Sequence, residues 1–139
     1  HAVVVDCAVR DDGKSFHYAA PSRVIETDPA LVACVEATLA DAGVPFVTGR
    51  TWTTDAVYRE ARTRVARRVE RDGSITVEME TSALLAVATY RGARLVSLLC
   101  PGESLVADEW DHRGRHSAFD VREGLFWLAA DAALRLPPA

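Results

Sequence analysis

The chain of 139 residues has the length of one compact domain, and its 49% hydrophobic and 26% charged residues are typical of a globular protein, not a disordered or fibrous one. Its net charge of −4 argues against a nucleic-acid partner. No apolar run approaches the roughly 18 residues that a membrane span needs, and residues 1–6 lack the zones of a signal peptide. The three cysteines are widely spaced and odd in number, which fits a reducing compartment. We therefore expect a cytoplasmic protein with no membrane partner.

The first third of the sequence predicts strands on either side of a helix. The valine-rich run Ala2–Val9 predicts a buried strand, and Pro21 makes the stretch Phe16–Ile25 a loop or an edge strand. Asp28 and Pro29 predict a helix start, because aspartate caps free backbone N–H groups and proline suits the first helical position. Gly43 is expected to end this helix, and Val44–Trp52 to form the next strand.

The rest of the sequence continues the alternation of helices and strands. The expected elements are a helix carrying Val57, Ala61, Val65 and Val69, a strand over Ile75–Glu80, a helix capped by Thr81 or Ser82 and ended by Gly92, a strand over Ala93–Cys100, and an amphipathic helix over Ser117–Leu136. This order predicts an α/β fold in which a mixed sheet forms the middle of three layers, with helices on both faces, within one domain over residues 1–139. Ligands of such sheets bind at the carboxyl ends of the strands.

The run Glu78-Met79-Glu80 follows one of these predicted strands. In an extended chain, Glu78 and Glu80 point to the same face, with Cβ atoms roughly 6–7 Å apart. Carboxylates accept hydrogen bonds, and the two hydroxyls of a pentose donate them, so such a pair suits a sugar. Spacing alone equally allows both glutamates to be solvated and Met79 to lie in the core.

Three segments in the same order resemble the nucleoside phosphorylase family, which includes uridine and purine nucleoside phosphorylases. The segments are Ala8–Gly13 with Phe16-His17-Tyr18, then Thr48–Tyr58, then Val77–Leu84 followed by Tyr90-Arg91-Gly92. The resemblance covers nearly the whole chain, but only the second half of the family's longer chain. The phosphate site of the family comes from its first half, and no phosphate-binding glycine motif occurs in this sequence.

The resemblance implies roles for particular residues. Glu80 would hold the ribose hydroxyls, Met79 would pack against the sugar, and Glu78 would lie near the base. Thr54, Val57 and Tyr58 fall in the base-pocket segment; many relatives have a stacking phenylalanine where this chain has Val57.

Two further residues are implied as the group that assists the leaving base. Glu103 falls where purine-specific relatives have an aspartate that protonates the base, and Arg115 falls near an arginine that assists that acid. A partly buried glutamate beside another carboxylate has a raised pKa and can supply a proton near neutrality. The alternative is that Glu103 is a turn residue and Arg115 a solvated charge.

Other groups of polar residues predict less. His112 and His116 lie four residues apart without convincing further ligands, so we expect no metal. The arginines between residues 59 and 71 could bind phosphate or an acidic partner, but interleaved acids favour a solvated helix face. Cys100 is expected to be structural.

The function that the resemblance implies is that of a pentosyltransferase, cleaving a nucleoside N-glycosidic bond by phosphorolysis to a free base and ribose 1-phosphate. Phosphate would be a co-substrate, with no cofactor. Its binding groups would come from a separate first-half chain or from a portion lost before the start at His1, and homo-oligomers are also expected. The alternative is a non-catalytic nucleoside- or ribose-binding or assembly subunit.

Overall fold

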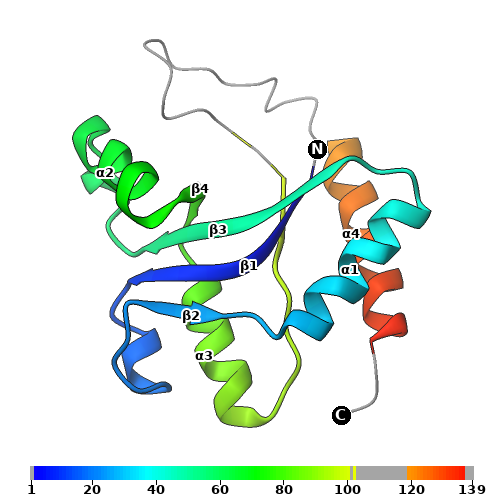
Figure 1. The fold of residues 1–139 in the computed structure, drawn as a ribbon, viewed down its shortest axis with the longest axis horizontal. Helices are drawn as coiled ribbons and strands as arrows, with labels where there is room; N and C mark the ends of the chain where they lie inside the picture. The colour runs from blue at the N-terminus through cyan, green and yellow to red at the C-terminus, as the bar shows by residue number, and fades with distance from the viewer. Residues whose placement is uncertain (1, 101, 103–118, 137–139) are drawn as a thin grey trace.

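The structure is a computed structural model that describes residues 2–100, 102 and 119–136 (Figure 1). Its strands are β1 (Ala2–Asp11), β2 (Val24–Glu26), β3 (Phe46–Thr54), β4 (Ser74–Glu78) and β5 (Leu98–Leu99). Its helices are α1 (Pro29–Asp41), α2 (Arg62–Asp72), α3 (Thr81–Arg91) and α4 (Phe119–Arg135), with short 3₁₀ helices η1 (Ser15–His17) and η2 (Val57–Arg59).

The sheet is mixed, with the order β2-β1-β3-β4. β1 is parallel to β3, and β3 is parallel to β4, so the carboxyl ends of these three strands meet at one edge of the sheet. β2 and β5 are both antiparallel to β1: β2 pairs with Cys7–Val9 and β5 with Val3 and Val4.

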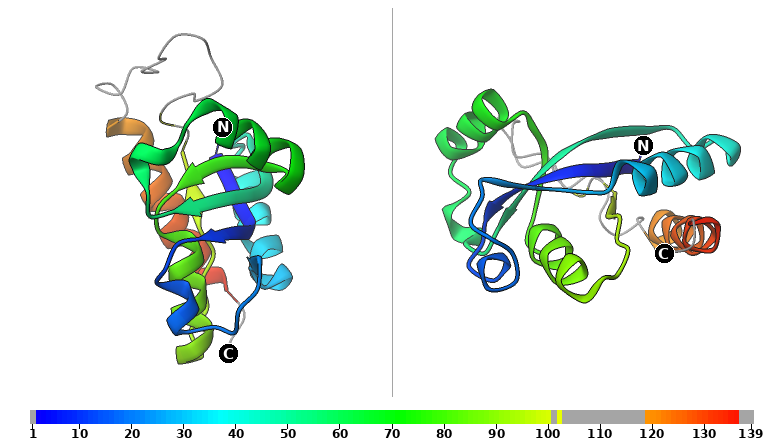
Figure 2. Two further views of the ribbon diagram at one scale, coloured as in Figure 1. Left: turned by 90° about the vertical axis from the view of Figure 1, so that its left-hand side faces the viewer. Right: turned by 60° about the horizontal axis from the view of Figure 1, so that its bottom comes forward.

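Helices cover both faces of the sheet, as the sequence predicts. α1 and α2 lie on one face and α3 lies on the other (Figure 2), and α4 packs against α1. The predicted three-layer α/β arrangement is confirmed. Among the described residues, no helix combines the length and the apolar character that crossing a bilayer requires.

The start of α1 and the ends of α2 and α3 follow from local chemistry. Asp28 caps α1, because its carboxylate accepts a hydrogen bond from the Ala30 N–H at 2.8 Å, and Pro29 opens the helix. Gly73 and Gly92 follow the last residues of α2 and α3 with φ near +65°, a left-handed conformation that glycine adopts without a steric penalty.

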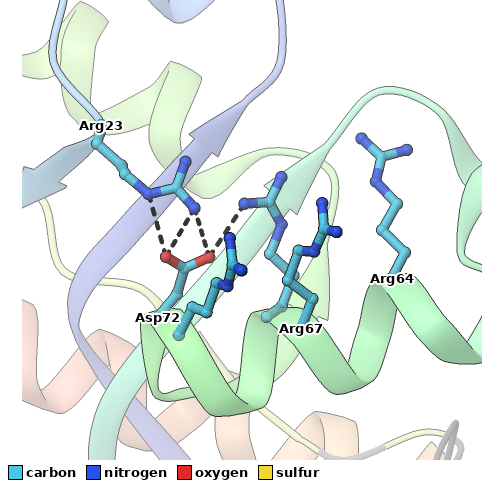
Figure 3. A pocket seen from close by; sticks show the side chains of 6 residues that line it. Arg23, Arg64, Arg67 and Asp72 are labelled. Carbon is cyan, nitrogen blue, oxygen red and sulfur yellow. Dashed lines mark hydrogen bonds and ion pairs between the residues drawn. The ribbon is translucent and has the colours of Figure 1, made fainter.

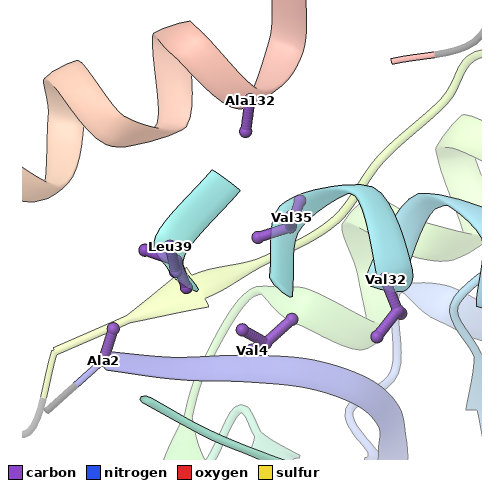
Figure 4. Close-up of a cluster of buried hydrophobic side chains, with 6 residues drawn as sticks. All are labelled: Ala2, Val4, Val32, Val35, Leu39 and Ala132. Atoms are coloured by element: carbon purple, nitrogen blue, oxygen red, sulfur yellow. The ribbon is translucent and has the colours of Figure 1, made fainter. Parts of the chain in front are cut away.

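The main apolar core joins β1 to α1 and α4 (Figure 4). Its buried side chains are Ala2, Val4, Val32, Val35, Leu39 and Ala132. Leu125 and Leu128 of α4 pack against this cluster, as the predicted apolar stripe requires, whereas Val121 of the same stripe is exposed.

Several predicted boundaries are wrong. The strand expected over Ala93–Cys100 is reduced to Leu98–Leu99, because β2 already occupies the edge of β1 beside Cys7–Val9 and leaves only Val3 and Val4 free for pairing. The helix expected from Val57 begins instead at Arg62, after η2. The strand expected to reach Glu80 ends at Glu78.

Candidate functional site

The candidate site is built at the carboxyl ends of the parallel strands β3 and β4. β3 ends at Thr54 and β4 ends at Glu78, and the register pairs Thr53 with Glu78. The chain then turns through Met79 and Glu80 into α3. Pairing of the two strands therefore brings the base-pocket segment next to the glutamate-methionine-glutamate run.

The carboxylate of Glu78 is fully engaged inside the protein. Its Oε1 accepts a hydrogen bond from the Thr53 hydroxyl at 2.5 Å. Its Oε2 accepts the backbone N–H groups of Glu80 at 2.8 Å and Thr81 at 2.6 Å. These N–H groups begin a helix and have no intrahelical partners, so Glu78 caps α3 from the end of the strand.

This geometry corrects the expectation that Glu78 and Glu80 share one face of a strand. The alternation of side chains stops at Glu78, and Glu80 is the N-cap residue of α3, with φ −127° and ψ −36°. The prediction that Thr81 or Ser82 is the N-cap is therefore wrong. The two carboxylates therefore differ in kind, since one is held by the backbone and the other is exposed.

Thr53 extends this cap and is a residue that the sequence reasoning missed. Its hydroxyl donates to Glu78 and accepts the Ser82 N–H at 3.0 Å. Three successive amides at the start of α3 are thus satisfied by two side chains from the ends of β3 and β4. The available signal was a threonine at the end of one predicted strand and a glutamate at the end of the next.

The other side chain that braces α3 comes from the end of β1. The hydroxyl of Ser82 donates a hydrogen bond to the buried carboxylate of Asp12, which also accepts the N–H and hydroxyl of Ser15 at 2.7 and 2.9 Å. Burial alone would raise the pKa of Asp12, but the hydrogen bonds from Ser82 and Ser15 outweigh it, and the pKa lies below its usual value. Asp12 therefore stays ionised and fixes α3 to β1.

The segment between β1 and β2 is held by a buried arginine. Arg10 donates to the Ser15 hydroxyl at 3.0 Å and to the Ala20 carbonyl at 2.6 Å, and its guanidinium lies 4.1 Å from the centre of the Phe16 ring. The segment between β1 and β2, which resembles the family's hairpin, is thus held in place by Arg10 and packs against α3.

The side chains available to a ligand are those around this frame. Met79 is 41% exposed and Glu80 is also exposed. Val57 and Tyr58 of η2 are 47% and 99% exposed, whereas Thr54 is buried and its hydroxyl accepts the Ala56 N–H at 3.3 Å. Met79 and Glu80 therefore present a thioether and an exposed carboxylate, whose Oε2 accepts the Met79 N–H at 3.3 Å, at the edge where β3 and β4 end.

Other predicted residues lie outside the described part of the chain. These are Glu103 and Arg115, proposed to assist the leaving base, and the pair His112 and His116. Among the residues that the structure describes, no three histidine, cysteine or acidic side chains are grouped as metal ligands.

Comparison with known proteins defines the family. The model of the phosphorylase superfamily matches residues 1–133, and the chain belongs to this family. No curated protein matches the chain significantly.

Solved structures share the fold. A uridine phosphorylase from Vibrio fischeri ES114, in complex with 6-hydroxy-1-naphthoic acid, superposes with a TM-score of 0.67 and is 23% identical over 97% of this chain. A P. knowlesi homologue of P. falciparum PNP superposes with a TM-score of 0.72 and is 16% identical over the same share. The chain covers 53% of each of these proteins, so it spans about half of their length.

Proposed function

We propose that this chain supplies the nucleoside-binding half of an enzyme that cleaves the N-glycosidic bond of nucleosides by phosphorolysis. Membership of the phosphorylase superfamily supports this reaction class. The observation that carries the proposal is the exposed pair Met79 and Glu80, held at the carboxyl ends of two parallel strands by the caps from Glu78 and Thr53. A loop fixed in this way presents a preorganised carboxylate to a ligand.

Glu80 and Met79 are the proposed ribose contacts. The Glu80 carboxylate accepts hydrogen bonds from the two ring hydroxyls, which strengthen as positive charge develops on the sugar and the base departs. Met79 covers the apolar side of the ring. Glu78, whose oxygens are already occupied, acts as a positioning residue and not as a base contact.

The base and the leaving-group chemistry complete the proposal. Val57 and Tyr58 on η2 border the base, and buried Thr54 shapes the strand end beneath them. Glu103 donates the proton to the departing base, and Arg115 orients that acid. The base leaves with the electron pair of the glycosidic bond, and phosphate attacks the anomeric carbon from the other side.

Phosphate is proposed as a co-substrate whose binding groups come from a first-half polypeptide, and no cofactor is required. The chain is proposed to work in the cytoplasm within an oligomer, either with that complementary half or with further copies of itself. Fourteen large apolar side chains of the described residues are exposed, among them Phe126 and Trp127 of α4, and such surface is suited to assembly.

The test is release of free base from uridine, inosine and 5′-methylthioadenosine, with and without phosphate. The chain is assayed alone and with a co-expressed first-half polypeptide of a family member. Glu80→Ala should lower kcat/KM about 100-fold, because it removes charge-assisted hydrogen bonds of about 1.5–3 kcal/mol from the transition state. Glu123→Ala on α4 removes an equally exposed carboxylate and should leave the rate unchanged.

The outcomes separate the two functions derived from the sequence. Phosphate-dependent base release that Glu80→Ala abolishes supports the phosphorylase. Nucleoside binding that Glu80→Ala weakens, with no turnover under any condition, identifies the non-catalytic binding subunit instead. Absence of both binding and turnover contradicts the proposal.

A further inference from the structure

A second feature is a pocket at α2, around which four arginines of this helix and Arg23 gather (Figure 3). The lining residues are Arg23, Arg64, Arg67, Arg68, Arg71 and Asp72. Four of these arginines occupy positions i, i+3, i+4 and i+7 of α2 and therefore form one stripe. The protein as a whole carries a net charge of −4, so this concentration of positive charge is local.

Two arginines of the cluster, Arg64 and Arg68, are held in place by Asp11 and Trp52 of the sheet. Asp11 accepts hydrogen bonds from Arg64 and Arg68, each at 2.7 Å, and from the indole N–H of Trp52 at 3.0 Å. Both guanidiniums also lie over the Trp52 ring, 5.4 and 5.2 Å from its centre. Trp52 is almost fully buried, so it forms a fixed platform that preorganises the two arginines.

The carboxylate inside the pocket is already saturated. Asp72 accepts hydrogen bonds from Arg23 at 2.7 and 3.1 Å and from Arg68 at 3.0 Å. Burial alone would raise the pKa of Asp72, but these partners outweigh it and hold the pKa below its usual value. Asp72 thus serves as an internal counter-ion that orients Arg23 and Arg68.

Two arginines of the stripe have no hydrogen-bond or ion-pair partner among the described residues. Arg67 and Arg71 are exposed and make no hydrogen bond or ion pair within the described part of the chain. They are spaced i, i+4, as are Arg64 and Arg68, and each such like-charge pair costs a helix about 0.2–0.5 kcal/mol. The buried Nε of Arg68 also lacks a partner among the described residues. An anion in the pocket would relieve both the repulsion and the shortage of acceptors.

We propose that this pocket is a binding site for the phosphoryl group of a small molecule. Arg67 and Arg71, one helical turn apart, donate to its oxygens from the rim, and Arg64, fixed on Trp52, donates from the base. Guanidinium forks match the geometry of phosphate oxygens and form charge-assisted hydrogen bonds with them. The sequence favoured a solvated helix face here, and the Trp52 platform and the saturated Asp72 are what that expectation lacked.

The pocket does not depend on the proposed nucleoside site. Side chains alternate along β3, so Trp52 faces α2 while Thr53 faces α3. The pocket on α2 and the nucleoside site proposed at Met79 and Glu80 therefore use different side chains from different elements. Failure of one proposal leaves the other standing.

The experiment is calorimetric titration of the full chain at low ionic strength with three probes: inorganic phosphate, pyrophosphate and ribose 5-phosphate. The test variant is R67Q/R71Q, and the matched control is R91Q/R94Q, which removes the same charge from the exposed last residue of α3 and from the segment that follows the helix. Saturable binding is expected for at least one probe. R67Q/R71Q should weaken it at least about 10-fold, and the control should change it less than about twofold.

A second measurement guards against unfolding of the test variant. Without anion, R67Q/R71Q should unfold at the same or a slightly higher temperature than the wild type, since it loses like-charge repulsion. The probe that binds should raise the Tm of the wild type and of the control but not that of R67Q/R71Q. Tighter binding of ribose 5-phosphate than of inorganic phosphate would identify an organic phosphate as the source, and the reverse order would identify the free ion.

Three results would overturn the proposal. One is the absence of saturable binding for all three probes. Another is an equal loss of binding in both double variants, which would show a general effect of net charge. The third is binding only of a polyanion such as duplex DNA, with steep salt dependence, which would indicate a nucleic-acid surface instead.

Discussion

The hydroxyl of Thr53 donates a hydrogen bond to the Glu78 carboxylate at 2.5 Å, and this contact joins the ends of β3 and β4 where the chain turns into α3. Glu78 in turn accepts the amides of Glu80 and Thr81. The exposed residues Met79 and Glu80 are therefore held by two side chains, Thr53 and Glu78, whose oxygens already make hydrogen bonds within the protein.

Thr53→Val tests this frame directly. Valine has nearly the same shape as threonine but leaves the Ser82 N–H without an acceptor and removes a donor to Glu78. We expect a loss of about 1–3 kcal/mol in the free energy of unfolding, the cost of an unsatisfied buried polar group. Thr53→Ser retains the hydroxyl and should cost less than Thr53→Val. A Thr53→Val variant as stable as the wild type in urea denaturation would show that these hydrogen bonds do not stabilise the fold.

Glu78 and Glu80 should differ sharply in their effect on stability. Glu78→Ala removes the cap from two helix amides and should destabilise the fold by about 1–2 kcal/mol. Glu80→Ala removes an exposed carboxylate and should change stability by no more than about 0.5 kcal/mol. Chemical denaturation of both variants checks the difference. A larger loss for Glu80→Ala would contradict the division into a structural and an exposed glutamate.

The sequence predicts the elements whose signals are local. The valine run of β1 and the start of α1 at Asp28 and Pro29 follow from neighbouring residues, and the structure confirms them. The strand predicted over Ala93–Cys100 fails because its length depends on which edge of β1 is free, and β2 occupies part of that edge. Pairing between segments far apart in the chain has no local signal.

In the candidate site, too, the sequence predicts the features with a local signal and misses the contacts between distant segments. The spacing of Glu78 and Glu80 indicates the right segment, but it predicts an extended strand through Glu80. Glu78 instead accepts hydrogen bonds from a threonine 25 residues earlier and from an amide that points at it only because α3 begins there. Likewise, the arginines of α2 look solvated in sequence, because nothing local indicates that Trp52 and Asp11 lie beneath them.

Acid should weaken the protein partly through Asp72. Its folded-state pKa lies below the usual aspartate pKa of 3.8, so its ion pairs contribute full stability above that value. The contribution is lost as the pH falls through the lowered folded-state pKa. Asp72→Asn should cost about 2 kcal/mol at neutral pH, since Arg68 is left partly unpaired in a buried position. The free energy of unfolding of this variant should also fall less steeply than that of the wild type as the pH is lowered from about 5 to about 2.

The matched control for Asp72 is Asp41→Asn. Asp41 pairs with Arg135 at 2.8 Å, but its side chain is 70% exposed, so this pair should contribute no more than about 1 kcal/mol. Identical pH profiles for wild type and Asp72→Asn, measured by urea denaturation at several pH values, would contradict the assigned role.

Leu39 provides a test of the packing between the layers. Its side chain is almost fully buried between β1, α1 and α4, in the cluster that includes Val4 and Ala132. Leu39→Ala should cost about 2–5 kcal/mol through lost burial and the cavity left behind. Leu134→Ala, at an 88% exposed position of α4, should cost little. Comparable losses in thermal unfolding would contradict the assignment of Leu39 to the core and of Leu134 to the surface.

The three thiols should differ in reactivity. Cys7 is buried in β1, and burial raises the pKa of its thiol despite the opposing effect of Arg50, whereas Cys34 and Cys100 are partly exposed. The thiolate is the reactive form, so an aromatic disulfide reagent should modify Cys34 and Cys100 in the folded protein and reach Cys7 only through unfolding. In C34S/C100S the labelling rate should be slow under native conditions and rise with urea in step with the unfolded fraction, while C7S should label rapidly without denaturant. Rapid native labelling of C34S/C100S would mean that β1 is accessible at Cys7, and the central position of this strand in the sheet would be wrong.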